Sequence, residues 1–161
     1  MAGIFRPVRA MEGRDVYPGK GKYGEWNVIM DKASAIYFSK NWPTPVIYTG
    51  YEIGWSIRAD GELFQKWPDS PIAKVLGPKG RPAWDQTAIL YCARGASNYW
   101  EVSKEGFVEI YPDGSCDWLP DPSYHHSYLI EKMSTEEMAR LIGKLEANAG
   151  HSINSTEHVV K

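Results

Sequence analysis

The chain has 161 residues, a formal net charge of −2 and an apolar fraction of 43%. This length suits one domain or part of a larger one, and the composition is typical of a soluble globular protein. The near-neutral charge gives no electrostatic reason to expect a nucleic acid or an anionic membrane as a partner. Two cysteines are too few for a disulfide framework, and no apolar run reaches transmembrane or signal-peptide length. A cytoplasmic location is therefore expected.

The first half of the chain alternates helical and extended patterns. Residues 1–23 are rich in glycine, proline and arginine, which predicts a loop. The elements expected next are a locally extended segment at 24–28, a helix at 32–40 capped by Asp31, a strand at 45–49 and a helical pattern at 53–57. Such alternation predicts an α/β fold with a parallel sheet.

The second half of the chain reads as helices followed by strands. The pattern predicts helical pieces at 62–67, 71–76 and 84–93, strands at 99–102, 107–111, 115–119 and 127–130, and a last helix after Ser134. Pro112, Asp113 and Gly114 predict a hairpin turn between two of these strands. Gly150 is expected to end the last helix, which gives a folded part at 1–150 and a polar tail at 151–161.

The first candidate site residues are Glu25 and Asn27. In an extended segment they point to one face, and Trp26 points to the other. A carboxylate beside an amide suits a sugar, because the carboxylate accepts hydrogen bonds from hydroxyls and the amide both donates and accepts. The alternative is that both are merely exposed polar residues flanking a buried Trp26.

The second candidate is Asp85. Pro82 favours a helix start, so Asp85 falls in the first turn of the helix, where the positive end of the dipole favours a carboxylate. Six apolar residues follow at 88–93, which predicts a helix buried on every side, with Cys92 in the core. Asp85 is then either a helix cap or a metal or substrate ligand on a rigid mount.

Two further pairs of residues, Gly50 with Glu52 and His125 with His126, are weaker candidates. Gly50 and Glu52 follow the strand at 45–49, where ligands bind in α/β sheets, although Glu52 also suits a solvated helix start. His125 and His126 are adjacent, so on a strand they face opposite ways, and they lack a matching cysteine or histidine set. We therefore expect no zinc site there.

Several segments, taken in order, resemble the inosine/uridine-preferring nucleoside hydrolases. Residues 24–28, Gly-Glu-Trp-Asn-Val, with Asp31 after them, resemble that family's Glu-Phe-Asn stretch and the aspartate that follows it. Residues 43–50 resemble its next strand and turn, and residues 84–88, Trp-Asp-Gln-Thr-Ala, resemble its His-Asp helix start. The late hairpins and the last helix also fit. The resemblance spans nearly the whole chain but covers only about the C-terminal half of a family member.

The resemblance implies a fold, an activity and residue roles. The fold would be α/β, the C-terminal part of a nucleoside-hydrolase-like fold, with helices, a few mostly parallel strands and late antiparallel hairpins. The reaction would be hydrolysis of the N-glycosidic bond of a ribonucleoside to ribose and free base, through an oxocarbenium-like transition state. Glu25 and Asn27 would bind ribose hydroxyls, and Asp85 would bind calcium and touch the sugar. Trp84 stands where the family has the histidine associated with leaving-group protonation, so it either stacks on a base or packs.

One departure from the family limits what this chain does alone. The family's N-terminal aspartates supply most calcium ligands and the water-activating base, and nothing upstream of Glu25 provides them, since Glu12 and Asp15 are isolated. Calcium takes six to eight oxygens, which Asp85 alone does not supply. We expect the chain to be inactive without an N-terminal half or a second copy. The alternatives are a non-catalytic ribose- or nucleoside-binding module and an unrelated aromatic-rich interaction domain.

Overall fold

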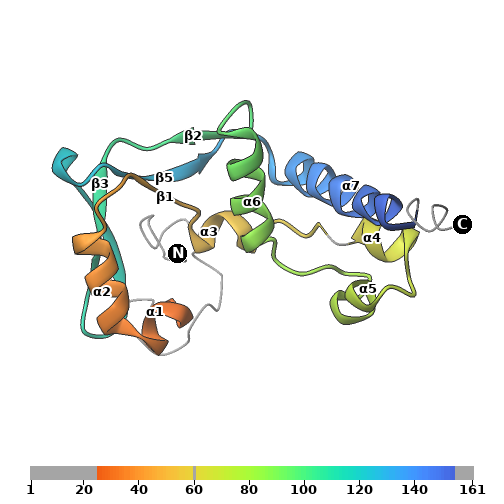
Figure 1. The fold of residues 1–161 in the computed structure, drawn as a ribbon, viewed down its shortest axis with the longest axis horizontal. Coiled ribbons are helices and arrows are strands. Elements are labelled where there is room, and N and C mark those ends of the chain that lie inside the picture. Colours follow the sequence, from red (N-terminus) through yellow and green to blue (C-terminus); the bar gives the residue numbers. More distant parts are fainter. Residues whose placement is uncertain (1–24, 60, 155–161) are drawn as a thin grey trace, which may run out of the picture.

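A computed structural model describes residues 25–59 and 61–154, which form a mixed α/β structure (Figure 1). The helices are α1 (Trp26–Met30), α2 (Lys32–Asn41), α3 (Tyr51–Trp55), α4 (Gly61–Lys66), α5 (Pro71–Leu76), α6 (Trp84–Arg94) and α7 (Thr135–Asn154), with a 3-10 turn, η2, at Pro122–Tyr124. The strands are β1 (Val46–Tyr48), β2 (Trp100–Val102), β3 (Gly106–Ile110), β4 (Cys116–Pro120) and β5 (His126–Glu131). Figure 1 shows α1, α2 and the sheet at one end, α4, α5 and α7 at the other, and α6 between them.

The sheet is organised around β5. This strand pairs in parallel with β1, from Val46↔His126 to Tyr48↔Tyr128, and antiparallel with β2. It also meets β3 at Gly106↔His126, and β3 forms the antiparallel hairpin with β4. The α/β class and the late hairpin are confirmed. The expectation of mostly parallel strands is wrong for the described strands, where only β1 and β5 pair in parallel. The turn between β3 and β4 is too short for a parallel crossover, which explains that antiparallel pair.

The turn between β3 and β4 forms where the sequence predicts it. Asp113 Oδ1 accepts hydrogen bonds from Ser115 N at 2.9 Å and Ser115 Oγ at 2.6 Å, which closes the turn. Gly114 adopts a left-handed conformation with φ of 85°, and a β-carbon there would lie 2.6 Å from Ile29 Cγ1. Glycine therefore serves both the turn and the close passage of α1.

The local signals that predict helix starts are also confirmed. Asp31 Oδ1 accepts from Ser34 N at 3.0 Å and caps α2. Ser134 and Glu137 form the predicted capping box at α7, with Ser134 Oγ 2.7 Å from Glu137 Oε2. However, α7 continues past Gly150 to Asn154. The predicted end was wrong because a single glycine costs a helix only about 1 kcal/mol.

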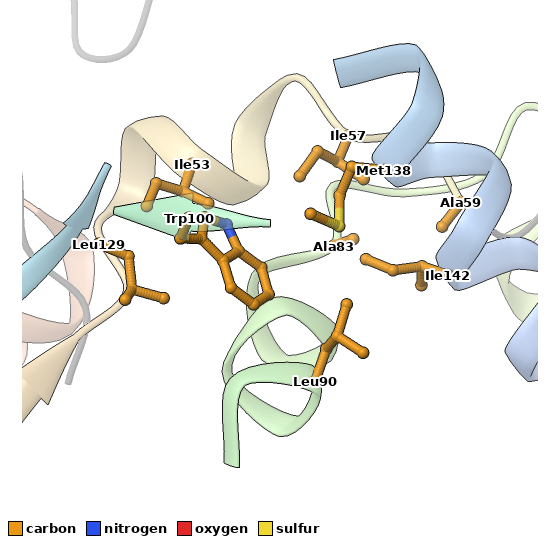
Figure 2. Close-up of a cluster of buried hydrophobic side chains, with 9 residues drawn as sticks. All are labelled: Ile53, Ile57, Ala59, Ala83, Leu90, Trp100, Leu129, Met138 and Ile142. Atoms are coloured by element: carbon orange, nitrogen blue, oxygen red, sulfur yellow. The ribbon is translucent and has the colours of Figure 1, made fainter. Parts of the chain in front are cut away.

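Two groups of buried side chains hold these elements together. The first joins α1, β1, α3, β3 and β4, and its buried members are Val28, Tyr48, Tyr51, Val108, Ile110 and Cys116. The second joins α3, α6, β2, β5 and α7, and its members, drawn in Figure 2, are Ile53, Ile57, Ala59, Ala83, Leu90, Trp100, Leu129, Met138 and Ile142. Because α3 contributes to both groups, it connects the sheet end of the molecule with the α7 end.

The loop predicted at 1–23 lies outside the described residues. None of the helices in the described part of the chain is both long enough and apolar enough to cross a membrane.

We expect Leu129→Ala to lower the free energy of unfolding by about 2–5 kcal/mol, because Leu129 is fully buried in the second group and its loss leaves a cavity. The matched control is Leu119→Ala on β4, where the leucine is 39% exposed. Chemical denaturation followed by circular dichroism measures both. Equal losses for the two variants would contradict the assignment of Leu129 to the core.

Candidate functional site

The start of α6 packs along the short helix α3, which follows the carboxyl end of β1. A β-carbon on Gly54 of α3 would lie 2.6 Å from Trp84 Cα and 2.5 Å from Trp84 Cδ1, so only glycine permits this approach. Ala83 N, just before α6, donates to the carbonyl oxygens of Gly54 and Ile57, at 3.1 Å each. The first turn of α6 is therefore fixed against α3, which itself begins three residues after β1 ends.

Trp84 packs within an aromatic cluster, defined here as Tyr51, Trp55 and Trp84. Its indole Nε1 donates to Tyr51 O at 3.0 Å, and its ring centroid lies 5.2 Å from Tyr51 and 6.1 Å from Trp55. Packing, one of the two roles predicted for Trp84, is thus present in the structure. An indole N–H is only a donor and does not titrate near neutral pH, so Trp84 has no proton to give a leaving group.

Asp85 lies in the first turn of α6, and its side chain is exposed. The N-cap of α6 is Ala83, and no side chain caps the helix, so the predicted capping role for Asp85 is wrong. Asp85 interacts with the helix start through the dipole alone. Its carboxylate makes no hydrogen bond to the other described residues and is open to a ligand.

Helix α6 is buried on one face only, which corrects the expectation of a helix buried on every side. Thr87 and Leu90 are buried, whereas Ile89 is 67% exposed. Cys92, predicted to lie in the core, is also exposed. The run of six apolar residues misled the prediction, since α6 packs against its neighbours along one stripe and its other face is left uncovered.

Glu25 and Asn27 do not lie on an extended strand. Glu25 is the N-cap of α1, and its Oε2 accepts from Val28 N at 3.1 Å. Its Oε1 accepts from Asn27 Nδ2 at 2.9 Å. Trp26 is 57% exposed and Glu25 is only 3% exposed, so the alternative of two exposed polar residues flanking a buried Trp26 is wrong as well. The extended prediction was wrong because a single helical turn is too short to show a period in the sequence.

For Glu52 the predicted position is confirmed, but the predicted exposure to solvent is wrong. It lies in the first turn of α3, beyond the carboxyl end of β1, as expected. Instead of being solvated it is 4% exposed. A β-carbon on Gly50 would lie 2.6 Å from Glu52 Cδ, so the glycine leaves room for this carboxylate. No local sequence signal indicates this burial, because it depends on the distant elements that cover Glu52.

His125 and His126 lie in different environments. His125 has φ of 49°, is exposed, and places Nδ1 3.0 Å from Glu105 Oε1. His126 is fully buried, with Nδ1 3.3 Å from the Tyr48 hydroxyl. The two rings therefore do not converge on one point.

Calcium does not fit the residues that the structure describes. In that part of the chain no group of three or more histidine, cysteine, aspartate or glutamate side chains is arranged to hold a metal ion. Asp85 offers at most two of the six to eight oxygens that calcium takes. We therefore derive no reaction step through a metal.

Comparisons with known proteins add no family assignment. No family model matches the sequence, and no curated protein and no solved structure matches it. The likeness to nucleoside hydrolases thus rests on the residues that carry it, and the roles of Glu25, Asn27, Trp84 and Asp85 stay predictions.

We expect Gly54→Ala to lower the free energy of unfolding by about 1–3 kcal/mol, because the added methyl group overlaps the backbone of Trp84. The matched control is Gly61→Ala at the start of α4, where the nearest atom to a β-carbon would be Pro78 O at 3.5 Å. This control should be neutral or stabilise by up to about 1 kcal/mol, as alanine is the better helix residue. Thermal unfolding of both variants measures the difference, and a neutral Gly54→Ala would contradict the close approach.

Proposed function

We propose that this chain is a nucleoside N-ribohydrolase-like protein that binds a ribonucleoside or ribose beside the carboxyl end of β1. The observation that supports the proposal best is the packing of the α6 start against α3, from Tyr51 O to Gly54, just after β1 ends. In α/β folds, ligands bind beyond the carboxyl ends of strands, where helix starts converge. Residues 43–50, which lead into α3, and residues 84–88, which begin α6, are two of the segments that carry the family resemblance.

In this proposal Asp85 makes the main contact with the sugar. Its carboxylate is exposed on the rigid first turn of α6, and it can accept hydrogen bonds from ribose hydroxyls. A carboxylate held there also stabilises the positive charge that develops on the sugar ring as the N-glycosidic bond breaks. The neighbouring Trp84 keeps the helix start in place through its bond to Tyr51 O.

Glu25 and Asn27 act as a pair. Glu25 holds the amide nitrogen of Asn27, which leaves Asn27 Oδ1 to accept from a sugar hydroxyl. The Asn27 side chain is exposed, whereas Glu25 is buried. Asn27 would therefore touch the ligand, and Glu25 would orient it in addition to capping α1.

Turnover belongs to a larger assembly in this proposal. The resemblance assigns the water-activating aspartates and most calcium ligands to a segment before the residues matched here, which an N-terminal half would supply. A second copy would contribute only this chain's own side chains across an interface. Calcium enters only with that segment. The chain alone is proposed to bind without hydrolysing, in the cytoplasm.

The second candidate function is a ribose- or nucleoside-binding module without catalysis. Two structural hydrogen bonds favour this candidate. Trp84 Nε1 donates to Tyr51 O, and Glu25 Oε2 accepts from Val28 N at the start of α1, so these polar atoms already have partners within the fold. The two candidates share the binding site and differ in whether an aspartate-rich partner converts binding into ribose release.

We expect Asp85→Asn to weaken ribose or inosine binding by about ten- to a hundredfold, because a hydrogen bond to a charged group is worth about 1.5–3 kcal/mol. Isothermal titration calorimetry on the purified chain measures the affinity. The matched control is Glu136→Gln, which removes an exposed first-turn carboxylate from α7 and should leave binding unchanged.

The same titration decides between the outcomes. Binding that survives Asp85→Asn, or no binding of ribose, inosine or uridine at all, would contradict the proposed site. Adding an aspartate-rich N-terminal half of a nucleoside hydrolase separates the two candidates. Calcium-dependent release of reducing sugar from inosine supports the hydrolase, and unchanged binding without release supports the binding module.

A further inference from the structure

His126 is a fully buried imidazole that the proposed function does not use. Its side chain has no exposed surface, and its ring lies between the rings of Tyr48 and Tyr124, at centroid distances of 5.8 and 6.2 Å. Nδ1 is 3.3 Å from the Tyr48 hydroxyl. Nε2 is buried and makes no regular hydrogen bond to the described residues, although the main chain of Trp42 lies near the ring. A neutral ring is tolerated in such a place, whereas a charged ring there would be poorly compensated.

His126 also occupies the point where three strands of the sheet meet. It is the first residue of β5, it is paired with Val46 of the parallel neighbour β1, and it is paired with Gly106 of β3 on the antiparallel side. Solvating a charged imidazole here requires at least one of these neighbours to move away. The hydrogen bond between the Tyr48 hydroxyl and His126 Nδ1 ties the ring to β1, since Tyr48 is the last residue of that strand.

The groups that face His126 offer no stable counter-charge. Tyr48 faces it from β1, Tyr124 faces it from η2, and His125 precedes it. Ser39 of α2 approaches Tyr48 and donates to Val108 O of β3. The carboxylate of Glu105, between β2 and β3, is bonded to His125.

We propose that protonation of His126 opens the β1–β5 pairing, so that the fold contains an acid-sensitive release of β1. Neutral His126 accepts from the Tyr48 hydroxyl at Nδ1, which joins β1 to β5 through their side chains. Protonation makes Nδ1 a donor and places a charge in the core, where aromatic rings, hydroxyls and the main chain of Trp42 surround it. The strand β1 then separates from β5, and the imidazolium reaches water.

The direction of the pH response follows from the pKa of His126 in the closed form, where β1 is paired with β5, and in the opened form, where it is not. Burial lowers the pKa of His126 below its ordinary value of 6.5; the nearby main chain of Trp42 opposes this shift, and His125 adds to it. The opened form, with an ordinary imidazole, therefore binds protons more strongly than the closed form. The closed form is fully favoured above pH 6.5 and loses stability as the pH falls below 6.5. Burial raises the pKa of Tyr48 to about 12, so its hydroxyl stays protonated throughout.

This inference does not depend on the proposed function. It requires no ligand, and it concerns the stability of the β1–β5 pair. If both hold, acid would displace the carboxyl end of β1, beside which the proposed ligand binds. Failure of the binding test would leave the acid response intact, and failure of the acid test would leave the binding site intact.

Amide hydrogen exchange measured by NMR between pH 7.5 and 5.5 tests the release. After correction for intrinsic exchange, protection of the β1 and β5 amides should fall by up to about tenfold per pH unit below pH 6.5, the limit for one proton taken up on opening. Protection along the described part of α7 should fall less, because the opening is local. Unchanged β1–β5 protection across this range would overturn the proposal.

Variants separate His126 from the other titrating groups. His126→Phe keeps an aromatic ring between Tyr48 and Tyr124, and His126→Gln keeps a partner for the Tyr48 hydroxyl. Each should abolish the fall in β1–β5 protection below pH 6.5. His125→Gln, which changes only the exposed neighbour, should retain the full fall. An acid response that persists in both His126 variants, or that disappears in His125→Gln, would overturn the assignment to His126.

Discussion

The site depends on the close approach of Gly54 to Trp84. Because Gly54 has no side chain, α3 and the start of α6 come close enough for Ala83 N to bond to two carbonyls of α3 and its C-terminal turn. The indole of Trp84 then reaches Tyr51 O from the other side. These contacts fix the direction of the first turn of α6, and with it the position of Asp85. A larger residue at position 54 would move the whole helix start.

The sheet brings α3 to that position. Strand β1 is only three residues long, and its parallel pairing with β5 determines where its carboxyl end points. β5 in turn is held by β2 and β3, so a short strand is anchored by a longer sheet. Both buried groups of side chains include residues of α3, Tyr51 in the first and Ile53 in the second, and so hold this helix in place. The site is therefore built from segments distant in sequence, and it requires both ends of the molecule to be folded.

The sequence predicts the local parts of this structure better than the long-range parts. The cap at Asp31 and the capping box at Ser134 depend on bonds spanning three residues, so residue type and spacing identify them. The burial of Glu52 and the exposure of Ile89 depend on which distant elements cover them, and periodicity does not carry that information. The short helix after Glu25 shows a related limit of sequence prediction. A segment of five residues is too short for its hydrophobic pattern to distinguish a helical turn from an extended strand. Of the candidate site, the sequence identifies Asp85 as a first-turn carboxylate, but not the contact at Gly54 that fixes it.

The most direct test of this account is an NMR measurement of the distance between Gly54 and Trp84 in solution. The account predicts a strong nuclear Overhauser effect between the Gly54 α-protons and the Trp84 ring proton on Cδ1, since any β-carbon on Gly54 would lie 2.5 Å from that ring carbon. The indole N–H of Trp84 should also be protected from exchange by its bond to Tyr51 O. Absence of this cross-peak, with a rapidly exchanging indole proton, would show that α3 and α6 do not meet and would remove the basis for the proposed site.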